Sequence, residues 1–283
     1  MKRSDVILVV LVYLLFSFRG VASAGDGYLN LEILDVGQGD SILITTPNGK
    51  RVLVDGGDNY EADYEISKRI PFYSCYIDIL ILTHPHYDHI VGLNRIMQRC
   101  KIGTIMFNDV SFDSRDFRLF KELSSNFNIK NMYAGDIFEI DEVNFIFLWP
   151  DKKFLQNRIP DLNDMSFVFL VDYGKFEALL TGDATEKVLG RLSFNKINEL
   201  TDSSLDVLKV PHHGSKYSLH KYFYSGIDPK MCVISVGKDN KFSHPYPGLV
   251  EYLNEIGCNV LRTDESGDVL IRVRWRPRWV ERW

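Results

Sequence analysis

The sequence predicts an α/β fold in which two β-sheets face each other and helices cover their outer surfaces. Three observations predict it: short β-rich segments come first as hairpins, strands then alternate with helices, and the pattern repeats in the second half of the chain. Sheets and helices bury their apolar faces by stacking in layers. The expected architecture is therefore a four-layer αββα sandwich, in which the polar loops that follow strands gather at one edge.

In the first half of the chain, apolar runs and turn residues predict four strands and two helices. Thr46-Pro47-Asn48-Gly49 stands between two β-rich runs and predicts a hairpin. The run over residues 77–83 is largely apolar, as expected of a buried strand. The predicted strands cover residues 29–35, 41–45, 51–55 and 77–83, and the predicted helices cover residues 90–99 and 115–126.

In the second half, short β-rich runs again alternate with helical stretches. Gly257 follows a helical stretch and is a typical helix stop. The last two strands are expected to close the sheet. The predicted strands cover residues 143–149, 167–172, 176–180, 207–210, 232–235, 259–262 and 269–274, and the predicted helices cover residues 184–193 and 249–256.

The first 24 residues are typical of an export signal. Two basic residues precede an apolar run over residues 6–18, and Ala22-Ser23-Ala24 provides small residues at the usual cleavage spacing. The apolar run is shorter than the roughly 20 residues of a membrane-spanning helix. We expect cleavage after Ala24, a periplasmic or extracellular protein, and one domain over residues 25–283. An uncleaved N-terminal anchor is the alternative.

Composition, charge and cysteine spacing limit the classes of function. The chain has 283 residues, of which 45% are hydrophobic, so a folded globular domain is expected. The net charge is −5, so nucleic-acid binding would need a local basic patch or metals. Cys75, Cys100, Cys232 and Cys258 lack the CxxC spacing of a cysteine zinc site. In an exported protein they can form one or two disulfides, with buried free thiols as the equal alternative.

The strongest chemical signal is His84-Pro85-His86-Tyr87-Asp88-His89, directly after the buried strand over residues 77–83. Three imidazoles and a carboxylate in one short segment are common ligands for zinc and other first-row metals. Burying such a cluster without a metal would be costly, because each polar group needs a partner. The alternative is a solvated polar turn, but further carboxylates and imidazoles follow in Leu180-Thr181-Gly182-Asp183, Pro211-His212-His213-Gly214-Ser215 and Ser243-His244-Pro245.

The segment matches the HxHxDH motif of the metallo-β-lactamase superfamily, so the sandwich is expected to be of the metallo-β-lactamase type. With Asp35-Val36-Gly37-Gln38-Gly39-Asp40-Ser41 and the downstream motifs, the chain resembles the hydrolase-like C-terminal domain of ComEC-type competence proteins over about residues 29–272. The membrane channel region of ComEC proteins is missing from this sequence, and the export signal stands in its place. We therefore expect an exported hydrolase.

The resemblance implies a centre of one or two divalent metal ions, zinc or manganese. His84 and His86 would hold the first ion, Asp88 and His89 would hold the second, and Asp183 would touch both. Asp55, in Asp55-Gly56-Gly57, would orient the loop that carries the motif rather than bind metal.

The later imidazoles complete the expected centre. His212 and His244 are the preferred ligands, and His213 is then a proton donor or phosphate contact, although the choice between His212 and His213 stays open. Many superfamily members carry another histidine between the HxHxDH motif and the bridging aspartate. This chain has none there, so a water, Asn163 or Asp164 would take its place.

Other residues near these motifs are weaker candidates for substrate binding. Asp35, Gln38 and Asp40 lie in a glycine-rich turn that either lines the cleft or is a structural hairpin turn with capped ends. Ser215 either contacts substrate or closes its own loop. Asn240 and Tyr246 flank His244 and are candidates to line the site, whereas a surface or hydrogen-bonded polar role is expected for His220.

The C-terminal end alternates apolar residues with arginines, which predicts a strand with arginine on one face. Trp275, Trp279 and Trp283 follow among further arginines. This tail would suit a phosphate backbone with stacked bases, or an anionic membrane surface. The alternative is an edge strand with a solvated arginine face.

The chemistry expected of such a centre is hydrolysis. Two cations about 3.5–4 Å apart can activate a water for attack on a phosphorus or carbonyl centre. The favoured function is a secreted phosphodiesterase or nuclease with a phosphoester or nucleic-acid substrate, in which Asp88 and His213 are catalytic. The alternatives are a lactone or β-lactam hydrolase of the same fold and a non-catalytic DNA-binding module. No membrane span is expected in the mature chain.

Overall fold

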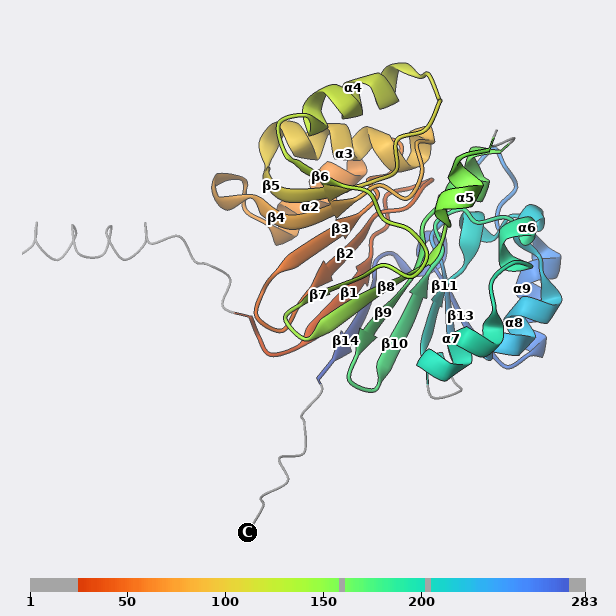
Figure 1. The fold of residues 1–283 in the computed structure, drawn as a ribbon. Helices are drawn as coiled ribbons and strands as arrows, with labels where there is room; N and C mark the ends of the chain where they lie inside the picture. The colour runs from red at the N-terminus through yellow and green to blue at the C-terminus, as the bar shows by residue number, and fades with distance from the viewer. Residues whose placement is uncertain (1–24, 158–160, 202–204, 275–283) are drawn as a thin grey trace, which may run out of the picture.

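The computed structural model describes residues 25–157, 161–201 and 205–274, which form two seven-stranded sheets with helices outside them (Figure 1). The expected four-layer αββα sandwich is confirmed. Both the predicted export signal and the Trp-containing tail lie outside the described residues. Within the described residues, no helix is both long enough and apolar enough to span a bilayer.

The first sheet joins an antiparallel ribbon to a parallel half, in the order β14-β1-β2-β3-β4-β5-β6. The predicted hairpin lies between β2 and β3, where the Thr46 N–H donates to the Lys50 carbonyl at 2.8 Å. Its strands are β1 (Leu29–Ile33), β2 (Ile42–Thr45), β3 (Arg51–Val54), β4 (Tyr76–Ile81), β5 (Lys101–Met106), β6 (Asn128–Lys130) and β14 (Val269–Val273). β14 pairs antiparallel with β1 at the sheet edge, and its residues alternate in burial as the sequence predicts.

The second sheet has the order β13-β12-β11-β10-β9-β8-β7 and runs parallel from β10 to β13. Its strands are β7 (Ile137–Ile140), β8 (Val143–Trp149), β9 (Val168–Tyr173), β10 (Phe176–Leu180), β11 (Val207–Lys209), β12 (Met231–Ile234) and β13 (Asn259–Arg262). The chain leaves β10, β11 and β12 at the same edge, because parallel strands share their direction. That edge carries the later polar motifs.

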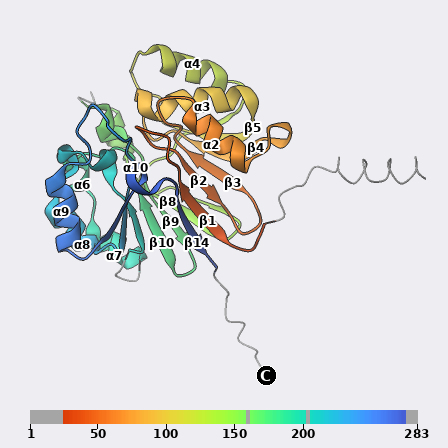
Figure 2. The same cartoon turned by 180° about the vertical axis from the view of Figure 1, so that it is seen from behind.

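Helices cover the outer face of each sheet, as the two opposite views show (Figures 1 and 2). On the first sheet lie α2 (Glu61–Arg69), α3 (Tyr87–Arg99) and α4 (Arg115–Ser124). On the second lie α6 (Glu186–Leu189), α7 (Phe194–Leu200), α8 (Lys221–Ile227) and α9 (Pro247–Glu255). The shorter elements are α5 (Lys152–Leu155), α10 (Thr263–Ser266), η1 (Phe72–Ser74), η2 (Leu162–Met165), η3 (Pro211–Gly214) and η4 (Lys216–Ser218).

The helix predicted over residues 184–193 was too long. Only Glu186–Leu189 is helical, and the chain turns at Gly190. Ser193 instead caps the next helix, α7, where its hydroxyl oxygen accepts from the Lys196 N–H at 3.3 Å. A serine that bonds the first turn of a following helix ends the preceding one, because its own backbone must leave the helical region.

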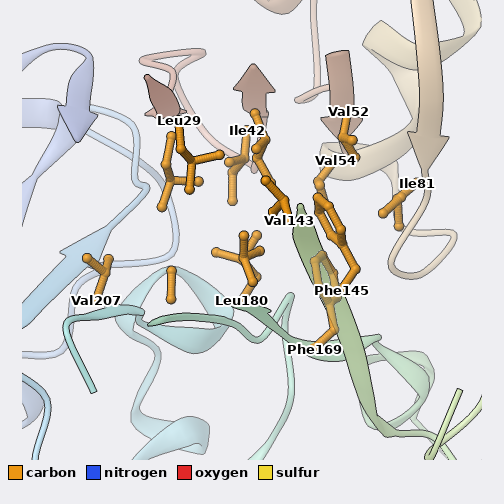
Figure 3. Packing of buried hydrophobic residues seen from close by; sticks show 14 of the residues in the cluster. Leu29, Ile42, Val52, Val54, Ile81, Val143, Phe145, Phe169, Leu180 and Val207 are labelled. Carbon is orange, nitrogen blue, oxygen red and sulfur yellow. The ribbon is translucent and has the colours of Figure 1, made fainter. Parts of the chain in front are cut away.

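The core between the sheets is aliphatic and aromatic (Figure 3). Leu29 and Ile42 of the first sheet pack with Phe145, Phe169 and Leu180 of the second, and each of these side chains is at most 2% exposed. Burying a side chain of this size stabilises the fold by roughly 1.5–3 kcal/mol. Two further apolar clusters lie between each sheet and its helices, so both sheets are buried on both faces.

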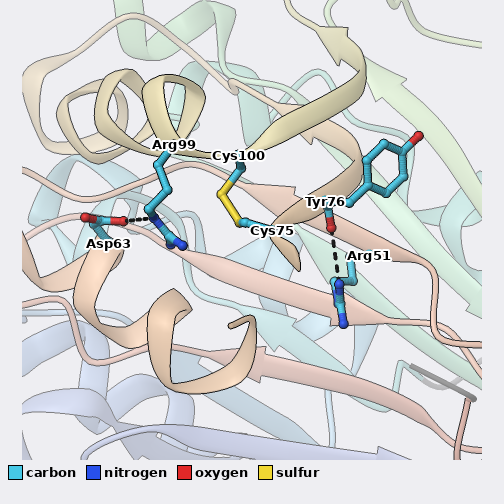
Figure 4. The surroundings of a disulfide bond; sticks show 6 residues. All are labelled: Arg51, Asp63, Cys75, Tyr76, Arg99 and Cys100. Carbon is cyan, nitrogen blue, oxygen red and sulfur yellow. Dashed lines mark hydrogen bonds and ion pairs between the residues drawn. A yellow bond between two sulfur atoms is a disulfide. The ribbon is translucent and has the colours of Figure 1, made fainter. Parts of the chain in front are cut away.

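All four cysteines are paired, which decides between the two alternatives left open by their spacing. Cys75 bonds Cys100, and Cys232 bonds Cys258 (Figure 4 shows the first pair). The first disulfide encloses the loop between β4 and α3, and the second encloses the loop before α9. Each disulfide therefore closes a strand–helix unit that carries candidate metal ligands.

Candidate metal centre

The candidate ligands meet because four loops follow strands that end at the same edge of the sandwich. His84 and His86 follow β4, and the next residues of the motif form the first turn of α3. This differs from the sequence prediction, which began the helix at residue 90. Because α3 begins at Tyr87, the helix holds Asp88 and His89 in place. The remaining candidates come after β10, β11 and β12: Asp183, His212, His213 and His244.

Asp183 lies at the middle of the cluster. Its Oδ2 atom is 3.3 Å from Nε2 of His89 and 3.3 Å from Nε2 of His213. The same oxygen is 3.9 Å from Nε2 of His84 and 3.9 Å from Nε2 of His212. One carboxylate thus faces imidazoles from both halves of the chain, as a carboxylate shared between two cations must.

An inner group of Asp88, His89, Asp183 and His213 fits a cation. One ligand atom from each lies within 4.8 Å of the others. Nε2 of His89, Oδ1 of Asp183 and Nε2 of His213 are buried and have no hydrogen-bond partner. Buried polar atoms without partners are costly, and a metal between His89 and His213 would satisfy both of their nitrogens.

Hydrogen bonds behind the imidazoles direct their free nitrogens inward. Nδ1 of His89 is 2.8 Å from Oδ2 of Asp55, and Nδ1 of His213 is 2.9 Å from the Ser235 carbonyl oxygen. Each acceptor holds the proton on Nδ1, which leaves Nε2 as the ligand atom. Asp55 is fully buried and also accepts from the Thr83 N–H at 2.8 Å and the Thr83 hydroxyl at 2.6 Å. Asp55 therefore orients the motif and does not face the cluster.

His84 and His86 form a second pair of nitrogen donors. Nε2 of His84 is 3.0 Å from Nδ1 of His86. The Thr83 hydroxyl donates to Asp55 and lies 3.1 Å from Nδ1 of His84, so it can accept the proton of that nitrogen. Nε2 of His84 is then unprotonated, and both nitrogens can bind one cation.

Comparison with known proteins agrees with this geometry. Residues 34–222 match the Metallo-beta-lactamase superfamily. The chain belongs to the metallo-β-lactamase superfamily. The metallo-beta-lactamase fold protein YhfI from Bacillus subtilis has the same fold, with a TM-score of 0.60, 13% identity, and coverage of 87% of this chain and 100% of YhfI.

Two relatives show which members of the superfamily this chain is similar to in sequence. ComE operon protein 3 of Bacillus subtilis (strain 168) is 28% identical over 95% of this chain and 36% of its own length. Recombination protein 2 of Haemophilus influenzae is 30% identical over 85% of this chain and 28% of its own length. The expected similarity to ComEC-type proteins is confirmed, and the chain spans about a third of these relatives.

The geometry reverses the preference between His212 and His213. His212 is the ligand expected from the sequence, but His213 is fully buried in the inner group and its Nε2 lies 3.3 Å from Oδ2 of Asp88. His212 lies farther out, and its side chain is 19% exposed. Both residues have left-handed backbones, with φ of 52° and 53°. This turn is costly for residues with a side chain, and it sends the two neighbouring imidazoles in different directions.

His244 approaches the cluster from the loop before α9. Its ring centroid is 5.6 Å from that of His212 and 6.2 Å from that of His213. Its Nδ1 atom is buried without a hydrogen-bond partner. Asn240 holds this loop, since its Nδ2 donates to the His244 carbonyl at 2.7 Å and its Oδ1 accepts from the His244 N–H at 3.0 Å. Asn240 therefore positions His244 and does not line the site.

The glycine-rich turn over residues 35–41 packs against the first turn of α3, which agrees with the structural alternative, and substrate binding by Asp35 and Gln38 stays a prediction. At Gly39, a Cβ atom would lie 2.0 Å from the Asp88 carbonyl oxygen, so only glycine permits this approach. Asp35 accepts from the Gly37 N–H at 3.3 Å and caps the turn. Oε1 of Gln38 accepts from the Gly237 N–H at 3.4 Å.

Asp40 does not fit the predicted role in substrate binding, because it is 1% exposed and forms an ion pair with the fully buried Lys209. Sequence reasoning missed Lys209. Its Nζ also donates to the Gly182 carbonyl at 3.0 Å and lies 3.9 Å from Oδ1 of Asp183. Lys209 thus ties the glycine-rich turn to the loop of Asp183. A lysine inside an apolar strand was the signal that could have found it, since a buried charge needs a partner.

The other candidates take structural positions. Ser215 is buried and accepts from the Tyr217 N–H at 3.3 Å, so it closes its own loop. His220 caps α8, as a polar structural role requires, by accepting from the Phe223 N–H at 3.1 Å. Asp164 is buried, and its Oδ1 accepts from the Thr185 hydroxyl. Oδ1 of Asn163 is buried without a hydrogen-bond partner, so Asn163 stays a candidate for the missing ligand.

The electrostatics of the cluster favour a bound cation. Burial disfavours charge on His213, but the carboxylates of Asp183, Asp88 and Asp40 together outweigh burial and raise the pKa of His213 to about 10. Burial also disfavours charge on His89, but the carboxylates of Asp183 and Asp55 outweigh burial and raise the pKa of that imidazole above its usual range. Burial, together with positive charge on His213, lowers the pKa of His244 to about 4. Protons and metals therefore compete for the inner nitrogens.

Proposed function

We propose that this chain is a metal-dependent phosphodiester hydrolase that acts on nucleic acid outside the cytoplasm. The observation that carries the proposal is the position of Asp183, whose Oδ2 faces imidazoles from both halves of the chain. Zinc or manganese bound there would make water nucleophilic at neutral pH and offset negative charge on a phosphate. His84 and His86 would hold one ion, and Asp88, His89 and His213 would hold the other, with Asp183 between them.

The chain's own residues then divide the remaining work. His212 is half-buried, whereas His84, His89 and His213 are buried, which fits His212 to contact a phosphate oxygen or donate a proton to the leaving group. This exchanges the roles first given to His212 and His213. Asp55 and Lys209 act through other groups: Asp55 orients His89, and Lys209 holds the loop of Asp183.

The names of two relatives support a DNA substrate. Their names refer to the ComE operon and to recombination, and recombination is a process of DNA. A phosphodiester substrate agrees with a centre that combines several nitrogen donors with carboxylates. The two disulfides support a location outside the reducing cytoplasm.

A substrate panel with metal analysis tests the proposal. We expect one to two metal equivalents in the purified protein, and hydrolysis of bis-p-nitrophenyl phosphate and single-stranded DNA with added Mn²⁺ or Zn²⁺. His89→Ala should lose both metal and activity, whereas His220→Asn is the matched control because it changes an imidazole outside the cluster. Hydrolysis of nitrocefin alone would contradict the proposal and favour the carbonyl hydrolase. A metal-free, inactive wild-type protein would favour the non-catalytic DNA-binding module.

A further inference from the structure

A hollow of about 320 Å³ lies directly beside the metal centre. It is lined by side chains from two loops, Ser215–Tyr217 and Phe242–Tyr246, and His244 is part of its wall. The hollow therefore shares an imidazole with the cluster around Asp183. Ser215 closes its own loop, whereas Lys216, Tyr217 and Phe242 have no role in the metal centre described above.

Three aromatic side chains of this hollow face solvent. Tyr217 is 60% exposed, Phe242 is 50% exposed and Tyr246 is 40% exposed. The Phe242 ring lies 5.7 Å from the His244 ring at an interplanar angle of 23°, so the two rings are nearly parallel. Exposed aromatic rings that cluster beside a reactive centre are typical of a stacking surface for a flat ligand.

Two lysines add positive charge to the same place. Nζ of Lys216 is 5.0 Å from the Tyr217 ring centroid, and Nζ of Lys241 is 5.1 Å from the Phe242 ring centroid. Among the described residues, no carboxylate lies within ion-pair distance of either lysine, and none lines the hollow. The chain as a whole has a net charge of −5, so this local excess of positive charge is a specific feature.

The hollow is already formed by close packing of its two loops. The Tyr246 N–H donates to the Gly214 carbonyl at 2.8 Å. At Gly214, where φ is +75°, a Cβ atom would lie 2.7 Å from Cβ of Pro245. The two loops thus fit together only with glycine here, and the hollow needs little rearrangement to bind a ligand.

We propose that this hollow binds a nucleotide of single-stranded DNA next to the phosphate that is cleaved. The base stacks on Phe242 and Tyr217, and the flanking phosphates contact Lys216 and Lys241, since stacking rings beside cationic side chains are how proteins hold single strands. This inference rests on the proposed function and assigns the side chains that would bind the DNA strand beside the metal centre.

A second hollow, of about 380 Å³, fits a strand less well. It lies beside α3 and α4 and includes Tyr60 and Arg95, but the Arg95 guanidinium already stacks 3.6 Å from the Tyr60 ring centroid. Asp58 and Asp116 also line it and would repel phosphates. The carboxylates that line this second hollow therefore make it a poorer binding site for a nucleic-acid strand than the hollow at His244.

Binding of a fluorescein-labelled, 12-nucleotide phosphorothioate oligothymidylate, followed by anisotropy with the metal-loaded protein, tests the inference. Phe242→Ala and Phe242→Leu should each weaken binding about tenfold, whereas Phe242→Tyr should stay within about twofold of wild type, because tyrosine keeps the stacking surface. Tyr73→Ala is the matched control, since Tyr73 is 87% exposed and does not line this hollow. Equal metal content and unfolding temperature would show that the variants are folded.

Controls on the ligand separate base stacking from phosphate contact. An abasic strand of the same length should bind wild type more weakly and be insensitive to Phe242→Ala. Lys216→Gln should weaken both strands and reduce the dependence of binding on salt.

The outcomes also separate this inference from the proposed function. If wild type binds no DNA, if Phe242→Ala and Tyr217→Ala both bind as tightly as wild type, or if only Tyr60→Ala weakens binding, the inference is overturned. If DNA binding depends on Phe242 but the protein hydrolyses no phosphodiester, nucleotide binding in this hollow is supported and the proposed hydrolase function is refuted. Hydrolysis of DNA with no dependence on the hollow refutes this inference alone.

Discussion

Replacing both cysteines of the Cys75–Cys100 disulfide with alanine is expected to destabilise the fold substantially. The bond joins the residue before β4 to the residue after α3, so it encloses the motif that supplies half of the metal centre. Both cysteines are buried in the apolar cluster beneath α3. Alanine removes the crosslink without placing a polar group in that cluster.

The magnitude follows from the length of the closed loop. The sequence separation of 25 residues corresponds to a loss of about 3.5 kcal/mol in the free energy of unfolding, if the crosslink acts by restricting the unfolded chain. The second disulfide, Cys232–Cys258, has a separation of 26 residues and provides a matched control. Because the entropy depends on the logarithm of loop length, both double variants should lose nearly the same free energy.

Urea unfolding followed by circular dichroism measures the effect. We expect each double variant to unfold at a lower urea concentration, and denatured wild-type protein to show no titratable thiols. A difference of more than about 2 kcal/mol between the two variants would contradict the chain-entropy reasoning. An unchanged midpoint in either variant would show that the crosslink does not stabilise the fold.

Three further changes probe the supports of the site and of the fold. Asp55→Asn should weaken metal binding about 10- to 100-fold, measured by competition with a chelator, because the amide has one acceptor oxygen and no charge, so it cannot accept from both the Thr83 N–H and Nδ1 of His89; unchanged affinity would show that the Asp55 carboxylate is dispensable. Lys209→Met should cost about 3–5 kcal/mol in the free energy of unfolding by removing the lysine partner of the buried Asp40 charge, and adding Asp40→Leu should recover part of this loss; a Lys209→Met protein as stable as wild type would refute the pairing. Asp268→Asn should destabilise the fold at pH 7 but not in acid. Burial raises the pKa of Asp268, but the Asp35 N–H and the Arg69 guanidinium outweigh burial and lower it, so the stabilisation is present above the unfolded value of ~3.9 and is lost as the pH falls through the lowered pKa. Urea unfolding at both pH values measures it, and an equal loss at both would refute the linkage.

Strands with strong apolar patterns could be predicted from the sequence alone. Residues 143–149, 176–180 and 259–262 were predicted with the bounds that the structure has for β8, β10 and β13. β5 was missed, because its segment Lys-Ile-Gly-Thr-Ile-Met combines a glycine and polar residues with few apolar ones. Its place in the middle of the parallel half, between β4 and β6, stabilises it as a strand despite this weak local pattern.

Helices were harder to predict where tertiary contacts hold them. α2 was missed because its sequence is mostly polar, and only Ala62, Glu65 and Ile66 are buried. The start of α3 was placed at residue 90, although the helix begins at Tyr87. Its first turn packs on the glycine-rich turn, where the Asp40 N–H donates to the Asp88 carbonyl at 3.3 Å. That contact joins segments far apart in the sequence, so no local pattern contains it.

Which chemical groups are available, and that they follow strands, could be read from the order of residues, because ligand types and apolar periodicity are local properties. The sequence therefore predicted the sandwich and the set of histidines and aspartates. The folded chain was needed to show that His213 rather than His212 lies in the inner group, and that Asp40 pairs with the buried Lys209. The physical reason is that the direction of a side chain depends on its backbone conformation and on its partners across the fold. Neither the left-handed turn at His212 and His213 nor the buried ion pair is visible in the order of residues.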